Sequence, residues 1–145
     1  MLASLAPDLD GLSLLFGLAA YGRYHHLLAH NLLFGAIVTL VSARWVGLRP
    51  GRLALVFAAF LSHLVGDYFG SGPGWSLWPF LPFSNKFFLF EHAWDISGWQ
   101  NIVITIAALA IALWVAVRDG RTPVELLSVA TDQKVVDAIR HRTRF

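Results

Sequence analysis

The stretch Leu53–Phe69, LALVFAAFLSHLVGDYF, decides how this chain is to be interpreted. It is almost continuously apolar, and its length lies at the short end of the range for a membrane-spanning helix, about 17–25 residues. Its second half carries His63 and Asp67, polar side chains that are costly inside a membrane and are therefore functional candidates. Because they are four residues apart, they share one helix face. The stretch thus predicts a membrane protein with a polar site near one end of a span.

The composition also indicates a membrane protein. The 145-residue chain is 57% hydrophobic and 14% charged, whereas soluble domains are about 45–50% apolar and about 25% charged. Two further spans are predicted over Leu32–Leu48 and Ile102–Val117. Leu12–Tyr21 is too short to cross and predicts a buried half-span or re-entrant helix; a cleaved signal peptide is less favoured because no basic residues precede it. We expect an all-α, polytopic membrane bundle of three to four helices.

Two classes of function are disfavoured by composition. The formal net charge of +2 is too small, and the arginines are too dispersed, for a nucleic-acid-binding protein. The chain has no cysteine, which excludes a thiolate metal site and a disulfide framework. A metal site in this chain must therefore be built from histidines and carboxylates.

Two groups of arginines orient the predicted bundle. One group surrounds the connection before Leu53, and the other follows Val117, so the positive-inside rule places both regions in the cytoplasm. The long segment Gly70–Gln100 then lies on the opposite side. It is rich in tryptophan and phenylalanine, which is typical of the membrane interface, and its prolines and glycines argue against one continuous helix. The arginines are Arg44, Arg49 and Arg52 in the first group, and Arg118 and Arg121 in the second.

The C-terminal region differs in kind from the spans. Thr122-Pro-Val-Glu125 has the pattern of a capping box with proline at the first helical position, which predicts the start of an amphipathic helix on the membrane surface. We therefore divide the chain into a membrane-embedded metal-site domain, residues 1–118, and a cytoplasmic amphipathic tail, residues 119–145.

The spans bring separate polar residues to one depth. His30 stands about 21 Å from Arg44 along one predicted helix, and Asp67 about 22 Å from Arg52 along its antiparallel neighbour, at 1.5 Å per residue. His30, His63 and Asp67 should therefore meet. His26 and His30 are four apart and would share a helix face, whereas His25 fits only if it precedes the helix. The simpler alternative for His63 and Asp67 is an ion pair that holds the bundle together.

Two carboxylates near the N-terminus extend this set. Asp8 and Asp10 lie in P-D-L-D-G, which alone could be an ordinary turn, with Asp10 capping a helix that begins near Leu12. Beside the histidines, they suggest a mixed site that suits Zn²⁺ first, with Mn²⁺, Mg²⁺ or Fe²⁺ as alternatives. The number of ligands is enough for two ions, an arrangement that stabilises both attacking and leaving oxygens in phosphoryl hydrolysis.

Polar residues outside these groups have open roles. Glu91 could serve as a general base, and together with His92 and Asp95 it could complete the site or only form a polar face of the aromatic segment. Lys86 and Arg23 could recognise phosphate oxygens, or could extend toward the membrane surface as single cations do.

The order P-D-L-D, H-H-L-L-A-H-N, S-H-L-V-G-D-Y and then W-P-F, over Pro7–Phe83, resembles the YdjM-like family of membrane-bound metal-dependent hydrolases. The resemblance favours His25 over His26 as the first histidine ligand. His26 then occupies the usual arginine position, beside the ligands or the substrate, and Asn31 the usual serine position. The H-x-x-x-D helix is also distantly similar to that of zinc-dependent phospholipase C and P1-type nucleases. The metal ligands that the resemblance implies are Asp8, Asp10, His25, His30, His63 and Asp67.

We therefore expect a metal-dependent hydrolase of a phosphoester on a membrane lipid or lipid-linked substrate. It would be an integral protein of a bacterial inner membrane, with its site on the non-cytoplasmic side, Asp10 or Glu91 as proton acceptor, and a homo-oligomer as one way to enclose the site. The alternative is a metal-ion or proton transport or binding protein without hydrolytic activity. Only Thr39 and Ser42 continue a polar path toward the arginines, which disfavours transport. A third class is a structural membrane protein that binds a partner.

Overall fold

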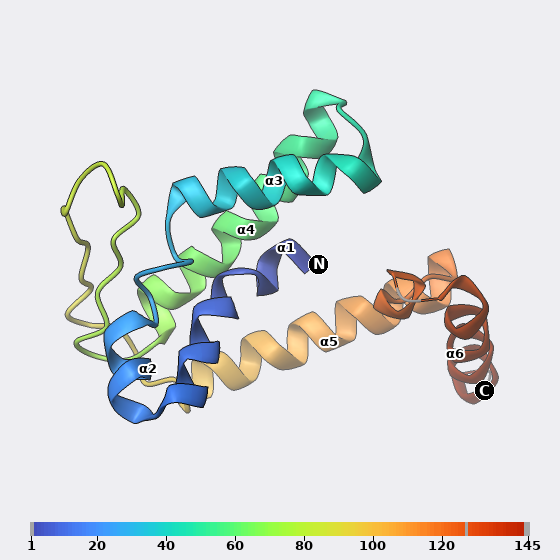
Figure 1. Cartoon of the computed structure of the whole chain (residues 1–145). Helices are drawn as coiled ribbons and strands as arrows, with labels where there is room; N and C mark the ends of the chain where they lie inside the picture. The colour runs from blue at the N-terminus through green and yellow to red at the C-terminus, as the bar shows by residue number, and fades with distance from the viewer. Residues whose placement is uncertain (1, 127, 144–145) are drawn as a thin grey trace. The chain divides into compact units, whose positions relative to one another are not determined.

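The computed structural model describes residues 2–126 and 128–143, which form an all-α protein, as expected (Figure 1). The chain divides into two compact units, Met1–Ile96 and Ser97–Phe145. The first unit contains α1 (Leu2–Leu5), the 3₁₀ helix η1 (Pro7–Phe16), α2 (Leu18–Tyr24), α3 (Leu32–Val46) and α4 (Pro50–Gly70). The second contains α5 (Trp99–Asp119), the 3₁₀ turn η2 (Pro123–Leu126) and α6 (Val129–Thr143).

The N-terminal segment corrects one prediction. Instead of a single helix over Leu12–Tyr21, the chain forms η1, which ends at Phe16, and then α2, which begins at Leu18. Gly17 separates them with φ of 99°, a conformation that glycine adopts readily and other residues do not. The resulting bend turns α2 back against η1 (Figure 1), and the carboxylate of Asp10 in η1 meets His25, which follows α2.

Helices α3 and α4 form the antiparallel pair that the sequence predicts. They approach closely at Gly35, where a Cβ atom would lie 2.7 Å from the ring of Phe60, a fully buried side chain. Of the described helices, α4 and α5 have the length and hydropathy of membrane spans. Helix α3 has 15 residues, about 22 Å, and is shorter than the bilayer core of about 30 Å. The predicted span to Leu48 is too long because Gly47, with φ of 78°, ends α3 at Val46.

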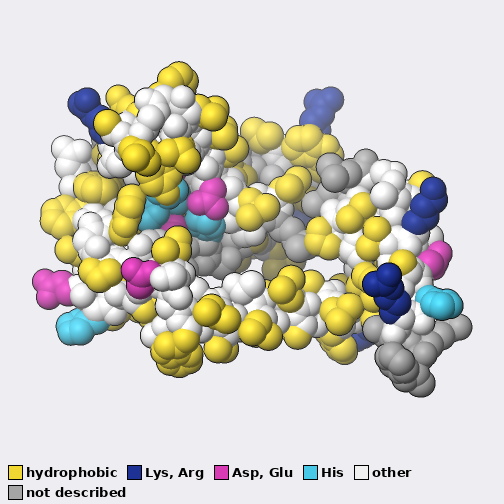
Figure 2. Space-filling view, turned by 90° about the horizontal axis from the view of Figure 1, so that it is seen from below, with side chains coloured by type: hydrophobic (Ala, Val, Ile, Leu, Met, Phe, Trp, Pro, Cys, Tyr) yellow, Lys and Arg dark blue, Asp and Glu magenta, His cyan; other side chains and the backbone are white. Residues whose placement is uncertain are grey.

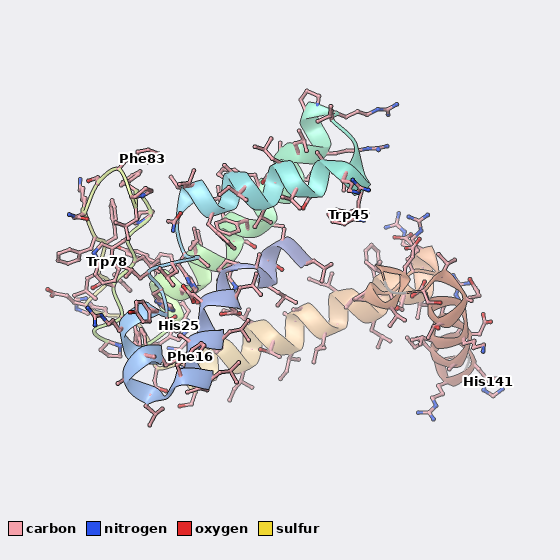
Figure 3. All side chains as sticks on the ribbon, viewed as in Figure 1. Phe16, His25, Trp45, Trp78, Phe83 and His141 are labelled. Atoms are coloured by element: carbon pink, nitrogen blue, oxygen red, sulfur yellow. The ribbon has the colours of Figure 1, made fainter. Side chains whose placement is uncertain are left out.

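Between Ser71 and Gly98 the chain runs as an irregular segment, which we call the aromatic loop. Leu77 and Phe88 pair as an isolated antiparallel bridge, and the carbonyl of Pro79 accepts a hydrogen bond from the amide of Leu32 at 2.9 Å. The loop is thereby tied to the start of α3. Trp78 and Phe83 lie on this loop, while Trp45 lies at the opposite end of α3 (Figure 3). Aromatic side chains at both ends of a helix are typical of the two membrane interfaces.

The C-terminal helix exists, but it begins later than predicted. Thr122 does not cap it: its hydroxyl accepts from the Val124 amide within η2, and α6 starts at Val129. Ser128 performs the capping, since its hydroxyl accepts a hydrogen bond from the Thr131 amide at 3.3 Å. The buried carboxylate of Asp132 accepts hydrogen bonds from the amide and hydroxyl of Thr122 and holds η2 against α6.

Candidate metal centre

The candidate site joins three segments of the first unit: η1, the turn His25–Asn31 and the second half of α4. The turn corrects the prediction that His26 and His30 share a helix face, because α3 begins only at Leu32. Asn31 fixes this start, since its side chain accepts from the Phe34 amide at 2.9 Å and donates to the Leu28 carbonyl at 2.8 Å. The histidines therefore project from a compact turn. Figure 3 labels His25 where α2 ends and this turn begins.

Asp10 lies at the base of the histidine turn and is not a helix cap. It belongs to the middle of η1, and its buried carboxylate accepts from Nδ1 of His25 at 2.8 Å, Nδ1 of His30 at 3.0 Å and the Ala29 amide at 3.1 Å. Burial alone would raise the pKa of Asp10, but the hydrogen bonds from His30 and the Ala29 amide lower it below its usual value. Because an ionised carboxylate only accepts hydrogen bonds, both histidines donate through Nδ1, and Nε2 is the nitrogen that each would offer to a metal ion after losing any proton it carries.

Three buried atoms face one another without a hydrogen bond between them. Nε2 of His30 and Nε2 of His63 each lie 3.1 Å from Oδ2 of Asp67, yet none of the three atoms has a hydrogen-bond partner among the described residues. Asp8 adds an oxygen 3.4 Å from Nε2 of His63. Acceptor atoms that converge in this way need a cation or a proton between them. Asp8, His30 and His63 offer ligand atoms within 4.8 Å of one another, which fits a divalent metal ion.

The same contacts, together with burial, set the pKa values of His30 and His26 in the turn. Burial alone would lower the pKa of His30, but the hydrogen bond with Asp10 and the negative charges of Asp10 and Asp67 raise it to about 9. A proton therefore occupies this imidazole at neutral pH when no cation is bound. For His26 the balance is opposite, because burial and the neighbouring His30 lower its pKa to about 4. The turn thus presents one strongly basic and one neutral imidazole within a few ångströms.

The histidines form a second group with aromatic neighbours. Ring nitrogens of His25, His26 and His30 lie within 4.8 Å of one another. Tyr21 stacks on His25 with ring centroids 4.5 Å apart, and Trp75 of the aromatic loop lies 5.0 Å from the ring of His26. The sequence alone did not reveal Tyr21 or Trp75 as neighbours of the site. The tryptophan and phenylalanine content marked the loop only as interfacial, and no motif tied Trp75 to the histidines.

Ser71 makes a further contact that no sequence motif indicated. Its hydroxyl donates to Oδ1 of Asp67 at 3.2 Å, which orients the carboxylate and directs Oδ2 toward His30 and His63. Its position four residues after Asp67, in the turn that ends α4, was the available signal.

The structure brings together all six residues of the implied ligand set, but it does not bring all other candidates to them. Glu91 is exposed, the ammonium of Lys86 lies over the ring of Phe88, and the guanidinium of Arg23 lies over the ring of Tyr24. Within residues 2–126, no hydrogen bond or ion pair joins Glu91, Lys86 or Arg23 to the site. Asp95 is exposed as well. The roles suggested for these four residues stay predictions.

The surroundings of the site are apolar. Histidine and acidic side chains appear side by side within a mostly hydrophobic surface (Figure 2). An open groove of about 300 Å³ is also lined in part by residues of the histidine turn. It is lined by Leu27, Leu28, Asn31, Leu33, Phe34, Ile37, Leu81 and Pro82.

Comparison with protein families shows which family the chain resembles over most of its length. The family model described as YdjM inner membrane protein matches residues 1–131 of the 145-residue chain. No curated protein and no solved structure matches the chain. The distant similarity to zinc-dependent phospholipase C and P1-type nucleases therefore stays a prediction.

Proposed function

Because this chain belongs to the YdjM inner membrane protein family, we propose that its histidine and aspartate cluster is the metal centre of a membrane-embedded hydrolase. The proposed substrate is a phosphoester on a lipid or a lipid-linked molecule. The observation that carries the proposal is the convergence of three buried, unpartnered atoms: Nε2 of His30, Nε2 of His63 and Oδ2 of Asp67. Buried polar atoms are normally paired, so three at one point favour a ligand that supplies positive charge.

The donor set indicates which ions fit. Imidazole nitrogens mixed with carboxylate oxygens suit Zn²⁺ best, and Mn²⁺ is an alternative. A bound divalent ion would lower the pKa of a water molecule and polarise a phosphoryl oxygen. Asp67 and Asp8 would supply the oxygens and His30 and His63 the nitrogens, while Ser71 orients the Asp67 carboxylate.

Asp10 and Asp8 are suited to different tasks. Both oxygens of Asp10 already accept hydrogen bonds from the histidine turn, so Asp10 orients His25 and His30 rather than moving a proton. The side chain of Asp8 is 54% exposed and reaches the cluster through His63. With Oδ1 directed toward the cluster as a ligand, Asp8 keeps Oδ2 free to take a proton from water, and Glu91 is the more distant alternative.

Membrane location and local surface both support a lipid substrate. The family is one of inner membrane proteins, so lipid headgroups are the phosphoesters nearest to the site. The apolar groove beside the histidine turn offers room for part of an acyl chain. The arginines of the connection between α3 and α4 support a site on the non-cytoplasmic side.

The test combines metal analysis with hydrolysis by the purified full-length protein. The wild type, His63→Ala and Asp67→Ala are compared in detergent, with His92→Ala as the control because His92 is an exposed histidine of the aromatic loop. We expect stoichiometric metal and release of phosphate or a headgroup from a panel of phospholipids and lipid-linked phosphates. Both site variants should lose metal and activity, and the control should keep both. A metal-free wild type, or unchanged hydrolysis by His63→Ala, would overturn the proposal. Metal flux into proteoliposomes without hydrolysis would instead favour the transport alternative.

A further inference from the structure

His26 has the least favourable placement in the histidine turn. Its φ of 68° is the only positive φ of a non-glycine residue in the described chain, and its side chain is only 4% exposed. Its Nδ1 atom is buried without a hydrogen-bond partner. A positive φ and an unpaired buried nitrogen each cost free energy, and a cation bound by this imidazole would offset that cost.

The neighbours of His26 are other potential ligands. Its ring centroid lies 4.5 Å from that of His25 and 4.4 Å from that of His30, and ring nitrogens of the three residues lie within 4.8 Å of one another. Its Nε2 lies 3.9 Å from Oδ2 of Asp67, too far for a hydrogen bond. Trp75 lies against the ring, with centroids 5.0 Å apart. The imidazole is therefore held beside two further imidazoles and a carboxylate, without bonding directly to them.

We infer that His26 is itself a metal ligand and that His25, His26 and His30 form a histidine-rich ion position. The inference rests on the metal centre of the proposed function and adds a residue and a selectivity to it. Asp10 engages Nδ1 of His25 and of His30, so each presents Nε2. A carboxylate that orients metal-binding histidines in this way is common at protein metal sites.

The cluster then divides into two positions. Nε2 of His30 can bind only one ion, so when it belongs to the histidine position, the other position keeps Asp8, His63 and Asp67. Oδ2 of Asp67 lies 3.1 Å from nitrogens of His30 and His63, between the two positions. Imidazole ligands favour Zn²⁺ and similar ions, whereas carboxylates also accept Mn²⁺ and Mg²⁺. The three-histidine position should therefore retain Zn²⁺ in the presence of excess Mn²⁺ or Mg²⁺. The carboxylate-rich position should exchange its Zn²⁺ for one of these ions.

The test measures metal binding rather than activity. Metal-free, full-length protein in detergent is titrated with Zn²⁺ and Mn²⁺ by calorimetry, and Co²⁺ binding is followed by visible absorption. The variants are His26→Asn and His26→Gly, since both residues accept a left-handed backbone and neither retains the imidazole. His92→Asn is the matched control on the aromatic loop.

We expect two Zn²⁺ ions per wild-type chain, one of them resistant to excess Mn²⁺. Both His26 variants should lose the resistant ion, with an affinity loss of at least about 10–100-fold, and should keep the exchangeable one. The Co²⁺ absorption should weaken in both. If the wild type binds metal and the two variants match it in affinity, stoichiometry and spectrum, His26 is not a ligand and only this inference fails. If the wild type binds no metal, the proposed function fails too. Unfolding temperatures of the metal-free proteins show whether the variants are folded.

Discussion

Replacement of Asp10 by asparagine tests whether this carboxylate orients the histidines or binds the metal itself. In the structure its two oxygens accept from Nδ1 of His25, Nδ1 of His30 and the Ala29 amide, at 2.8, 3.0 and 3.1 Å. Asparagine offers one oxygen and an NH₂ group that would face an imidazole N–H donor. At least one histidine must therefore rotate, or change to the tautomer that protonates Nε2 and removes the lone pair from the cluster.

The size of the effect follows from burial. The Asp10 side chain is 1% exposed, and removal of one partner from a buried charged pair costs about 3–5 kcal/mol. Loss of a carboxylate that orients a metal-binding histidine typically lowers metal affinity by about 10–100-fold, or about 1.4–2.7 kcal/mol. We therefore expect Asp10→Asn to bind the same number of ions as the wild type, with an affinity reduced by that factor.

Calorimetric Zn²⁺ titration and thermal unfolding of the metal-free protein provide the measurements. Glu91→Gln is the control, because it makes the same carboxylate-to-amide change at an exposed position. If Asp10→Asn loses a whole ion from the stoichiometry, Asp10 is a direct ligand, as the family resemblance implies, and the orienting role is wrong. Unchanged affinity together with unchanged stability would refute both roles.

Further predictions concern packing, proton linkage and the second unit. Gly35→Ala should lower stability by about 1–3 kcal/mol, because the added Cβ would lie 2.7 Å from a buried ring. Gly66→Ala should raise stability by about 0.5–1 kcal/mol, because its added Cβ would meet nothing within 4 Å. Unfolding temperatures in detergent check the sign of each change. Zn²⁺ affinity should rise about tenfold per pH unit from about pH 7 to 9, because the pKa of His30 is raised to about 9 and its proton must leave before Nε2 binds a metal. A Zn²⁺ affinity that calorimetry finds unchanged over this pH range would contradict this. Asp132→Ala should cost about 1–3 kcal/mol, since it leaves the amide and hydroxyl of Thr122 without their acceptor, and an unchanged unfolding temperature would show that this contact is not stabilising.

The parts of the site that the sequence predicts are those that depend on regular helices. His63 and Asp67 share a face of α4 because of their spacing, and the antiparallel neighbour brings His30 to the same depth. Both inferences need only helix pitch and the position of the arginines. They hold although α3 begins two residues after His30.

The remaining features depend on backbone conformations that the sequence pattern does not specify. The period of polar residues suggested that His26 and His30 lie on a helix, but Asn31 caps α3 and leaves both in a turn. The sequence suggested that Asp10 caps a helix, yet its carboxylate accepts hydrogen bonds from residues 15 to 20 positions later in the chain. Such long-range partners are set by the bend at Gly17, which only the folded structure reveals. For the same reason Trp75 could not be assigned to the site.

The position of the cluster follows from the unequal lengths of α3 and α4. The two helices are joined at the arginine-rich end, and α4 is six residues longer, which corresponds to about 9 Å. Beyond the start of α3, the last turns of α4 therefore lack an apolar helical neighbour on that side. The histidine turn occupies this place and meets Asp67, while η1 contributes Asp10 from the other side of the turn. If α4 spans the bilayer, the histidines lie within its length rather than above it, where burial excludes water and strengthens every charge interaction. A short helix beside a long one thus provides the room for a polar turn, in surroundings where the carboxylates interact more strongly with any cation that binds there.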